Sequence, residues 1–219
     1  MKKTKKKITK AAIALFNEYG IPSVRLQQIA DKCDISLGNL AYHFPIKQDL
    51  LVFVAEYIST DIDPILKDKA PSPYLIDFDN RLAVYYNLIN QYSFYFLDIM
   101  ELQERYAHIH SQRAEYIDIM IQNIYQWIRQ KEEKGLIRPE VQEGQYQRLS
   151  QAIWMIIIFW TTQQKIRSSQ EKNEEEFKLV VWNQILPNFT ELGLLEYEAL
   201  ILPQLQQYQP EFDKLVDLL

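Results

Sequence analysis

Glycine, proline, cysteine and histidine are scarce in this sequence, and each shortage excludes a class of protein. Its 219 residues include five glycines and nine prolines, too few for an all-β architecture, which needs a turn signal about every 8 to 12 residues. The one cysteine, Cys33, cannot form an intramolecular disulfide and has no C-x-x-C partner for a zinc or redox site, which suits a reducing, cytoplasmic environment. Long helices remain as the expected structure.

Long apolar runs are also missing. The longest covers residues 152–160, whereas a helix that crosses a bilayer needs about 20 apolar residues. The basic first ten residues lead into an amphipathic segment with Asn17 and Glu18 instead of an apolar core and a cleavage site, so they do not form a secretory signal. We therefore expect no membrane partner.

Histidine is too rare to support much catalytic or metal chemistry. Glu104 and His108 share a helix face but His110 points elsewhere, so an exposed helix junction is expected there and no metal site. No Ser-His-Asp, Cys-His or glycine-rich phosphate loop can be assembled from three histidines and five glycines. We expect neither an enzyme nor a cofactor.

Charge is unevenly distributed along the chain. Residues 1–50 hold nine basic and four acidic side chains, a net of +5, and the other 169 residues hold 15 basic and 25 acidic ones, a net of −10. This division favours a small head that binds a polyanion, joined to an acidic body with another task. The alternative is a lysine tail that serves solubility.

Apolar side chains recur at helical spacing along the whole chain. They predict a helix over about 8–19 closed by Gly20 and Pro22, a short second helix with Ser23 as a possible N-cap, and a third from Ser36 to Phe44. A fourth stripe starts at Ile46 and is expected to stop at Pro64. Longer helices are predicted over 76–91, 93–105, 109–134, 144–168, 173–192 (closed by Gly193) and 195–217, with Pro187, Pro203 and Pro210 interrupting the last two.

Two short helices joined by a turn of about three residues, with a helix before them, form a tri-helical helix-turn-helix unit. On a helical wheel of residues 36–44, the outward side is hydrogen-bonding (Ser36, Asn39, Tyr42 and His43) and the inward side is apolar (Leu40, Ala41 and Phe44). Ser36 and the free amides of the first turn can hold a phosphate, Gly38 permits close backbone approach, and Tyr42, His43 and Lys47 can donate to phosphate oxygens.

The run IADKCDISLGNLAYHFPIKQDLL, residues 29–51, resembles the TetR/AcrR family of bacterial transcription regulators. That family typically reads I-A-x-x-A-G-V-S-x-G-x-L-Y-x-H-F-x-x-K-x-x-L-L across its second to fourth helices. The resemblance is strong over about residues 8–55. It implies DNA contact by Tyr42 and His43, for which the alternative is an ordinary surface role.

Several positions depart from the family pattern. Ala41 stands where a tyrosine is usual, and Asp34 replaces the turn glycine, which aspartate tolerates because it visits the left-handed region more readily than most residues. Val24 and Arg25 occupy the place of a Thr/Ser pair, so Arg25 is expected to supply the phosphate contact by charge. Leu37 either meets a thymine methyl or packs inward, and the helical wheel slightly favours packing.

The polar side chains best placed to read base edges are Asn39 and Gln27, although an exposed helical glutamine needs no special role. The lysine cluster near the start is interpreted as a flexible arm that adds sequence-independent attraction to DNA. The predicted DNA-binding residues are Arg25, Gln27, Ser36, Leu37, Gly38, Asn39, Tyr42, His43 and Lys47.

The acidic body is rich in aromatic side chains. Each alone is more simply a core residue, but together they could line the largely apolar kind of pocket that small molecules favour. The family resemblance places an effector among the helices spanning about 76–168. The candidate ligand-binding residues are Tyr86, Phe94, Tyr125 and Trp154, and the expected effector is apolar or aromatic.

Residues 152–160 are apolar all round, so that helix is expected to be covered on every side. In the family that the chain resembles, this helix and its long neighbour over 173–192 pair with their twofold mates as a four-helix bundle. This assigns a dimer interface to Ile153, Ile157, Trp160, Phe177, Val181 and Ile185. The alternative is that both helices lie in the monomer core.

The sequence therefore predicts an all-α protein with an N-terminal tri-helical helix-turn-helix domain at 1–46, a connecting helix and loop at 47–72, and a larger helical-bundle domain for ligand binding and dimerisation at 73–219. The expected function is that of a homodimeric repressor, released from a palindromic double-stranded DNA operator by a small molecule. The alternative is a helical protein-interaction or ligand-binding module that does not bind DNA.

Overall fold

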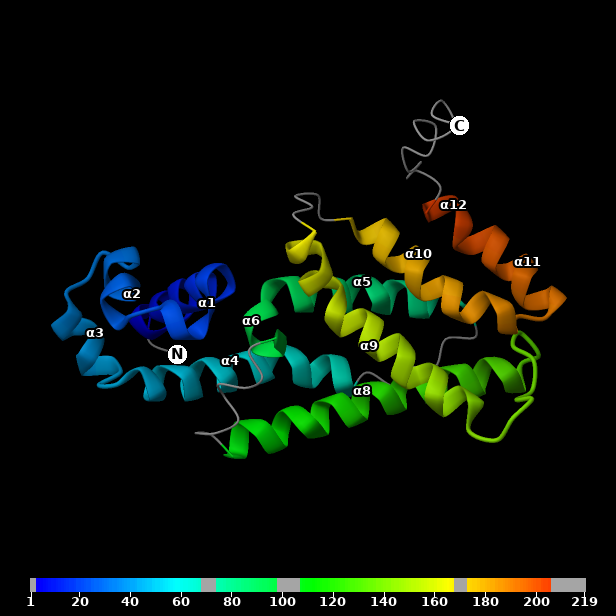
Figure 1. Cartoon of the computed structure of the whole chain (residues 1–219), viewed down its shortest axis with the longest axis horizontal. Helices are drawn as coiled ribbons and strands as arrows, with labels where there is room; N and C mark the ends of the chain where they lie inside the picture. Colours follow the sequence, from blue (N-terminus) through cyan, green and yellow to red (C-terminus); the bar gives the residue numbers. More distant parts are fainter. Residues whose placement is uncertain (1–2, 68–73, 98–106, 168–172, 206–219) are drawn as a thin grey trace, which may run out of the picture. The chain divides into compact units, whose positions relative to one another are not determined.

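The computed structural model describes residues 3–67, 74–97, 107–167 and 173–205, and within these ranges every regular element is a helix (Figure 1). This confirms the all-α prediction. The helices are α1 Lys3–Ser23, α2 Leu26–Lys32, α3 Leu37–His43, α4 Lys47–Lys67, α5 Ile76–Gln91, α6 Ser93–Leu97, α8 Ala107–Glu133, α9 Gln145–Ile166, α10 Glu174–Ile185, α11 Glu191–Leu200 and α12 Leu202–Leu205. In the described part of the chain, no helix is long and apolar enough to cross a membrane.

The chain divides into two compact units. The first contains residues Met1–Asp68 and Leu88–Ile119, and the second contains Lys69–Asn87 and Met120–Leu219. Helices α5 and α8 contribute residues to both. The units are defined by proximity in space, so the predicted sequence ranges of the domains stay predictions.

In the first unit, α1 begins at Lys3 and is interrupted at Gly20, where a φ of 76° breaks the helical conformation at the predicted position. The expectation of a flexible lysine arm is wrong for residues 3–10. These residues are helical because Ile8, Ala11 and Ala12 are buried by the rest of the unit, and tertiary packing stabilises most helices more than their intrinsic propensity does.

The turn between α2 and α3 follows the sequence closely. Asp34 adopts a φ of 52°, the left-handed conformation expected for it. The Ser36 hydroxyl caps α3 by accepting a hydrogen bond from the Asn39 amide at 3.1 Å. Ser23, in contrast, does not cap α2: the N-cap is Arg25, whose backbone amide donates to the Gln28 side chain at 2.7 Å.

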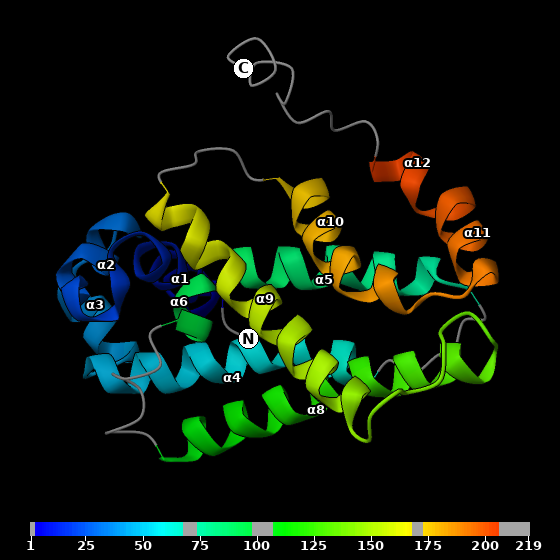
Figure 2. The ribbon, with the colours of Figure 1, turned by 45° about the vertical axis from the view of Figure 1, so that its right-hand side comes forward.

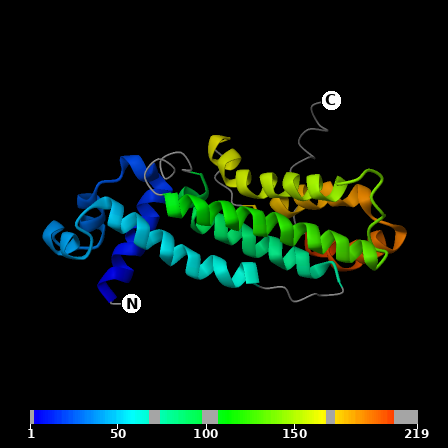
Figure 3. The same ribbon diagram turned by 90° about the horizontal axis from the view of Figure 1, so that it is seen from below.

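Helix α4 continues through Pro64 to Lys67, so the expected stop at this proline is wrong. Proline removes one backbone hydrogen bond of a helix, but Ile62 and Leu66 on either side of it are buried. Their packing keeps the last turn helical. Figures 1 and 3 show α4 beside the part of α8 that belongs to the same unit, where the Tyr116 hydroxyl donates to Asp63 at 2.7 Å.

Hydrogen bonds and a ring contact join the carboxyl end of α1 to the rest of the first unit. The Asn17 side chain donates to the Gln91 carbonyl at 2.8 Å and accepts hydrogen bonds from the Ser93 hydroxyl at 3.0 Å and the Phe94 amide at 3.1 Å. The Phe94 ring packs against Phe16 with 5.3 Å between ring centroids. The carboxyl end of α1 is therefore fixed to the junction of α5 and α6.

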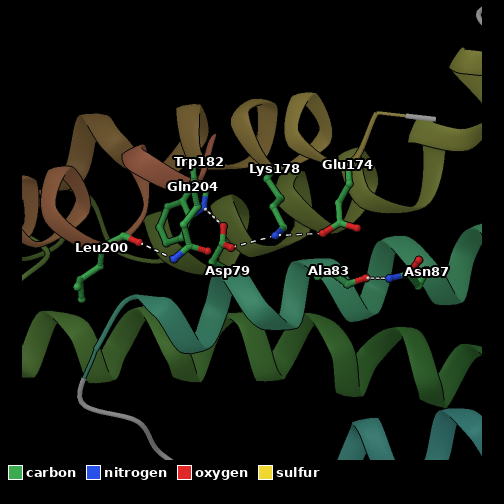
Figure 4. Close-up of polar contacts among 8 residues, drawn as sticks. All are labelled: Asp79, Ala83, Asn87, Glu174, Lys178, Trp182, Leu200 and Gln204. Carbon is green, nitrogen blue, oxygen red and sulfur yellow. Dashed lines mark hydrogen bonds and ion pairs between the residues drawn. The ribbon is translucent and has the colours of Figure 1, made fainter. Parts of the chain in front are cut away.

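In the second unit, two aspartates near the start of α5 bind α8 and α10 with the same chemistry. Asp79 accepts from the indole of Trp182 and the ammonium group of Lys178, each at 3.0 Å (Figure 4). Asp77 accepts from the Trp127 indole at 3.1 Å and lies 3.5 Å from the Lys131 ammonium group. Figure 2 shows α10 beside α9, its main helical neighbour in this unit.

The predicted helix over 173–192 ends early, at Ile185, and a new helix begins at Glu191. Pro187 interrupts the chain as expected, and the Thr190 hydroxyl starts α11 by accepting from the Gly193 amide at 3.1 Å. Gly193 therefore lies inside α11 and does not close a helix. A Cβ atom there would lie 2.1 Å from the Leu136 carbonyl oxygen, so only glycine permits this approach. The predicted segments 98–105 and 206–217 lie outside the described residues.

Candidate nucleic-acid interface

Helix α3 presents a polar face to solvent and is held by an apolar one. Leu40 is completely buried and Phe44 is 2% exposed, which fixes how the helix is rotated about its axis. Opposite them, Ser36 and Asn39 are exposed and Tyr42 is 82% exposed. A short helix that is packed on its apolar side and exposes a polar side has the form of a recognition helix.

Other residues of α3 extend this face. Leu37 is 42% exposed, so the slight preference for inward packing is wrong. His43 is half-buried and its ring lies 5.2 Å from that of Tyr42 in an edge-on arrangement. A Cβ atom at Gly38 would meet only the Ser36 hydroxyl, at 3.9 Å. The glycine is therefore not required by internal packing, and it leaves the backbone open to close approach.

Arg25, the N-cap of α2, and Gln27 in its first turn are both exposed. The Gln27 amide donates to the Asp31 carboxylate at 2.7 Å, which leaves its second N–H and its carbonyl oxygen for a base edge. Val24, beside Arg25, is buried. Of the residues at the Thr/Ser position of the family pattern, Arg25 alone is therefore available to a partner.

Lys47, the first residue of α4, is in contact with α1. Its ammonium group donates to the Ile21 carbonyl and lies 6.0 Å from the Phe16 ring centroid. The side chain thus holds the start of α4 against the end of α1. Its assignment as a phosphate contact stays a prediction.

The four candidate ligand-binding residues do not belong to one unit. Phe94 lies in the first unit, packed on Phe16, whereas Tyr86, Tyr125 and Trp154 lie in the second. Tyr86 is 7% exposed and packs on Phe177. The ligand assignments stay predictions.

The six residues assigned to a dimer interface are all at least nine-tenths buried within a single chain; their exposures are Ile153 0%, Ile157 0%, Trp160 8%, Phe177 1%, Val181 0% and Ile185 0%. This burial favours the alternative, in which they form the protomer's core. Within the single chain, residues 152–160 are not covered on every side, because Met155 is 61% and Phe159 is 48% exposed. Ile166, on the same face of α9, is 74% exposed.

Glu104, considered above as a metal ligand, lies outside the described residues, as do the side chains of His108 and His110. Within the part of the chain that the structure describes, no three His, Cys, Asp or Glu side chains gather in a way that could hold a metal ion.

The sequence interpretation also missed that the first lysines form an ordered helical face. Their i, i+3, i+4, i+7 spacing was the available signal.

The capped, tri-helical arrangement and the exposed face of α3 define a helix-turn-helix DNA-binding protein. Residues 8–53 match the family model described as "Bacterial regulatory proteins, tetR family", and residues 59–193 match the TetR model described as "Bacterial transcriptional repressor". The chain belongs to the TetR family, whose members are transcriptional regulators and not enzymes.

Relatives of known sequence match part of the chain. The chain is 41% identical over 54 residues to the HTH-type transcriptional regulator RutR of Escherichia coli strain K12, a match that covers 25% of this chain and 26% of the relative. It is 31% identical over 104 residues to the uncharacterised HTH-type transcriptional regulator YuxN of Bacillus subtilis strain 168, which covers 46% of this chain and 36% of that protein. The chain thus spans only about a quarter to a third of these relatives.

Solved structures share the fold over nearly the whole chain. A TetR-family regulator from Marinobacter aquaeolei VT8 has a TM-score of 0.79 at 23% identity and covers 96% of this chain and 100% of its own. A transcriptional regulator from Saccharomonospora viridis, solved in complex with choline, has a TM-score of 0.67 at 18% identity and covers 87% and 100%. At these identities the likeness shows the fold alone.

Proposed function

We propose that the protein is a sequence-specific repressor that binds a palindromic operator as a homodimer and leaves it when a small molecule binds the helical body. The observation that carries this proposal is the exposed hydrogen-bonding face of α3, held in place by the buried Leu40 and Phe44. A helix of this kind fits the major groove of duplex DNA. A cytoplasmic location follows from the need to reach DNA in a bacterium.

The residues of this face make two kinds of contact, to phosphate oxygens and to base edges. The Ser36 hydroxyl, the Gly38 backbone, Tyr42 and His43 contact phosphate oxygens and fix the register of α3 on the duplex. Asn39 reads a base edge, for which a carboxamide is suited because it donates and accepts together. From the neighbouring positions, Leu37 meets a thymine methyl, Gln27 reads a second base, and Arg25 and Lys47 bind phosphate.

For the homodimer, we propose that α9 and α10 pair with the same helices of a second copy. Met155, Phe159 and Ile166 support this, because large apolar side chains exposed along one helix face mark an interaction surface. Phe159→Glu should convert the dimer to a monomer in light scattering. Val141→Glu is the matched control, since Val141 is 93% exposed and precedes the first residue of α9. Equal masses for both variants would contradict the pairing.

For the effector, we propose an apolar or aromatic small molecule bound among the helices of the second unit, near Tyr86, Tyr125 and Trp154. The choline complex of the Saccharomonospora viridis regulator shows that a protein of this fold can hold a small molecule. Compounds that shift Trp154 emission should also release DNA. Trp154→Ala should abolish the release while operator binding is retained. A variant that responds fully but no longer dimerises would place Trp154 in the interface.

The experiment that tests DNA binding is a gel shift of the purified protein with the DNA upstream of its own coding sequence, against a random duplex of equal length. We expect tighter binding to the upstream DNA and a steep loss of affinity with salt, because bound lysines and arginines release counterions. Asn39→Ala should cost about 1 to 3 kcal/mol on the upstream DNA and reduce discrimination at one base pair per half-site. Equal binding to both duplexes at every salt concentration would contradict the proposal and favour a module without DNA recognition.

A further inference from the structure

The amino-terminal part of α1 carries a row of lysines on one face. Lys3, Lys6, Lys7 and Lys10 are exposed, and their i, i+3, i+4, i+7 spacing places them along one side of the helix. The opposite side packs into the first unit through Ile8, which is completely buried, and its apolar neighbours on the same face. The lysines are therefore displayed by a rigid helix.

The ammonium groups of these lysines form no ion pair in the described part of the chain. Among the residues that the structure describes, no carboxylate lies within 4.0 Å of any of the four. The nearest acidic residue within α1 itself is Glu18, two turns beyond Lys10. Four unpaired cations on one surface create a local positive potential that attracts a polyanion.

The turns of α1 that carry this row pack against the helix-turn-helix. The Lys7 carbonyl accepts a hydrogen bond from the Cys33 thiol at the end of α2, at 3.6 Å. The Lys5 ammonium group lies 5.2 Å from the ring centroid of Phe44, the residue that ends α3, and 5.0 Å from that of Phe53 in α4. The first two turns of α1 are thus held against the ends of both helices of the motif.

We propose that this lysine face of α1 is a second, ordered contact to the DNA backbone, flanking the base pairs that α3 reads. The inference rests on the proposed function and adds to it the extent of the DNA site. From Lys3 to Lys10 the helix rises about 10 Å, at 1.5 Å per residue, which equals about three steps between successive phosphates of one strand, at a rise of 3.4 Å each. Because the backbone that carries the lysines is already helical, binding loses less conformational entropy than it would with a flexible arm.

The test compares two triple variants with the same change of net charge. The first is Lys3→Gln/Lys6→Gln/Lys10→Gln, and the control is Lys67→Gln/Lys134→Gln/Arg167→Gln, which removes three exposed cations from other parts of the chain. A Lys→Arg triple at positions 3, 6 and 10 keeps the charge. Circular dichroism confirms that each variant is folded before DNA is added.

Each protein is titrated with the upstream DNA fragment across a series of salt concentrations, and its contacts are mapped by hydroxyl-radical footprinting. Loss of three phosphate contacts should lower the slope of log affinity against log salt by about 2.7 per protomer, at about 0.9 for each contact. The glutamine variant should also lose backbone protection at the edges of the footprint while its base preference within the half-sites is unchanged. The arginine variant should behave as the wild type does.

A glutamine variant with the same salt slope and footprint as the charge-matched control would overturn the inference, and DNA binding by α3 would stand. A wild-type protein that binds the upstream fragment and a random duplex equally would instead overturn the proposed function itself. The two failures are distinguishable because the first is read from the variants and the second from the wild type alone.

Discussion

Asp79 offers the sharpest test of what holds the second unit together. Its side chain is 1% exposed and binds two residues of α10, the Lys178 ammonium group and the Trp182 indole, each at 3.0 Å (Figure 4). Asp79→Ala would leave the indole N–H buried without an acceptor, because Trp182 is completely buried. Lys178, 12% exposed, would keep only Glu174 at 3.1 Å.

The expected cost follows from this burial. Removal of one partner from a buried ion pair destabilises a protein by about 3 to 5 kcal/mol, because the remaining charge is left uncompensated. An exposed pair contributes about 0 to 1 kcal/mol. The Lys67–Asp63 pair is of the exposed kind, at 3.8 Å with side chains 79% and 44% exposed, so Lys67→Ala is a suitable control.

The assay is urea unfolding followed by tryptophan emission. All four tryptophans belong to the second unit, so the signal reports the unit that contains Asp79. Asp79→Ala should lower the free energy of unfolding by about 3 to 5 kcal/mol, and Asp79→Leu/Lys178→Met should lose less, because it removes both charges. A loss below about 1 kcal/mol for Asp79→Ala, equal to that of the control, would refute the reasoning.

Three further predictions concern the first unit. Asn17→Ala removes three hydrogen bonds to the α5–α6 junction and should lower stability by about 1 to 3 kcal/mol in urea unfolding followed by far-ultraviolet circular dichroism; an unchanged midpoint would contradict it. Burial and a neighbouring carboxylate raise the pKa of Tyr92 and of Tyr116 above the usual 10.0, so their contribution to stability is complete below pH 10 and should be lost as pH rises beyond it. Tyr116→Phe should flatten that alkaline decline, and an equally steep decline would count against it. Lys47→Ala should weaken binding to all duplexes about equally and reduce the salt slope by about 1 if the residue binds phosphate, whereas reduced stability with an unchanged slope would assign it to the Ile21 contact alone.

The sequence by itself determined the features that depend on neighbouring residues. Helix α3 could be located and oriented because Leu40 and Phe44 alternate with polar positions at helical spacing, and its start because a serine at Ser36 can cap. Asp34 and Gly20 were recognisable as breaks, since few residues adopt positive φ. The family motif lies in this same local stretch, which is why the residues expected to bind DNA follow from the sequence alone.

Only the tertiary structure decided which segments meet. Ile153 and Val181 carry the apolar patterns of an interface and of a core alike, and their burial inside one chain depends on how α9 and α10 are turned toward their neighbours. The pairing of Asp79 with Lys178 joins residues 99 apart, and no spacing rule connects them. The need for glycine at position 193 arises from the approach of Leu136, far away in sequence. These features result from contacts between distant segments, and local periodicity carries no information about such contacts.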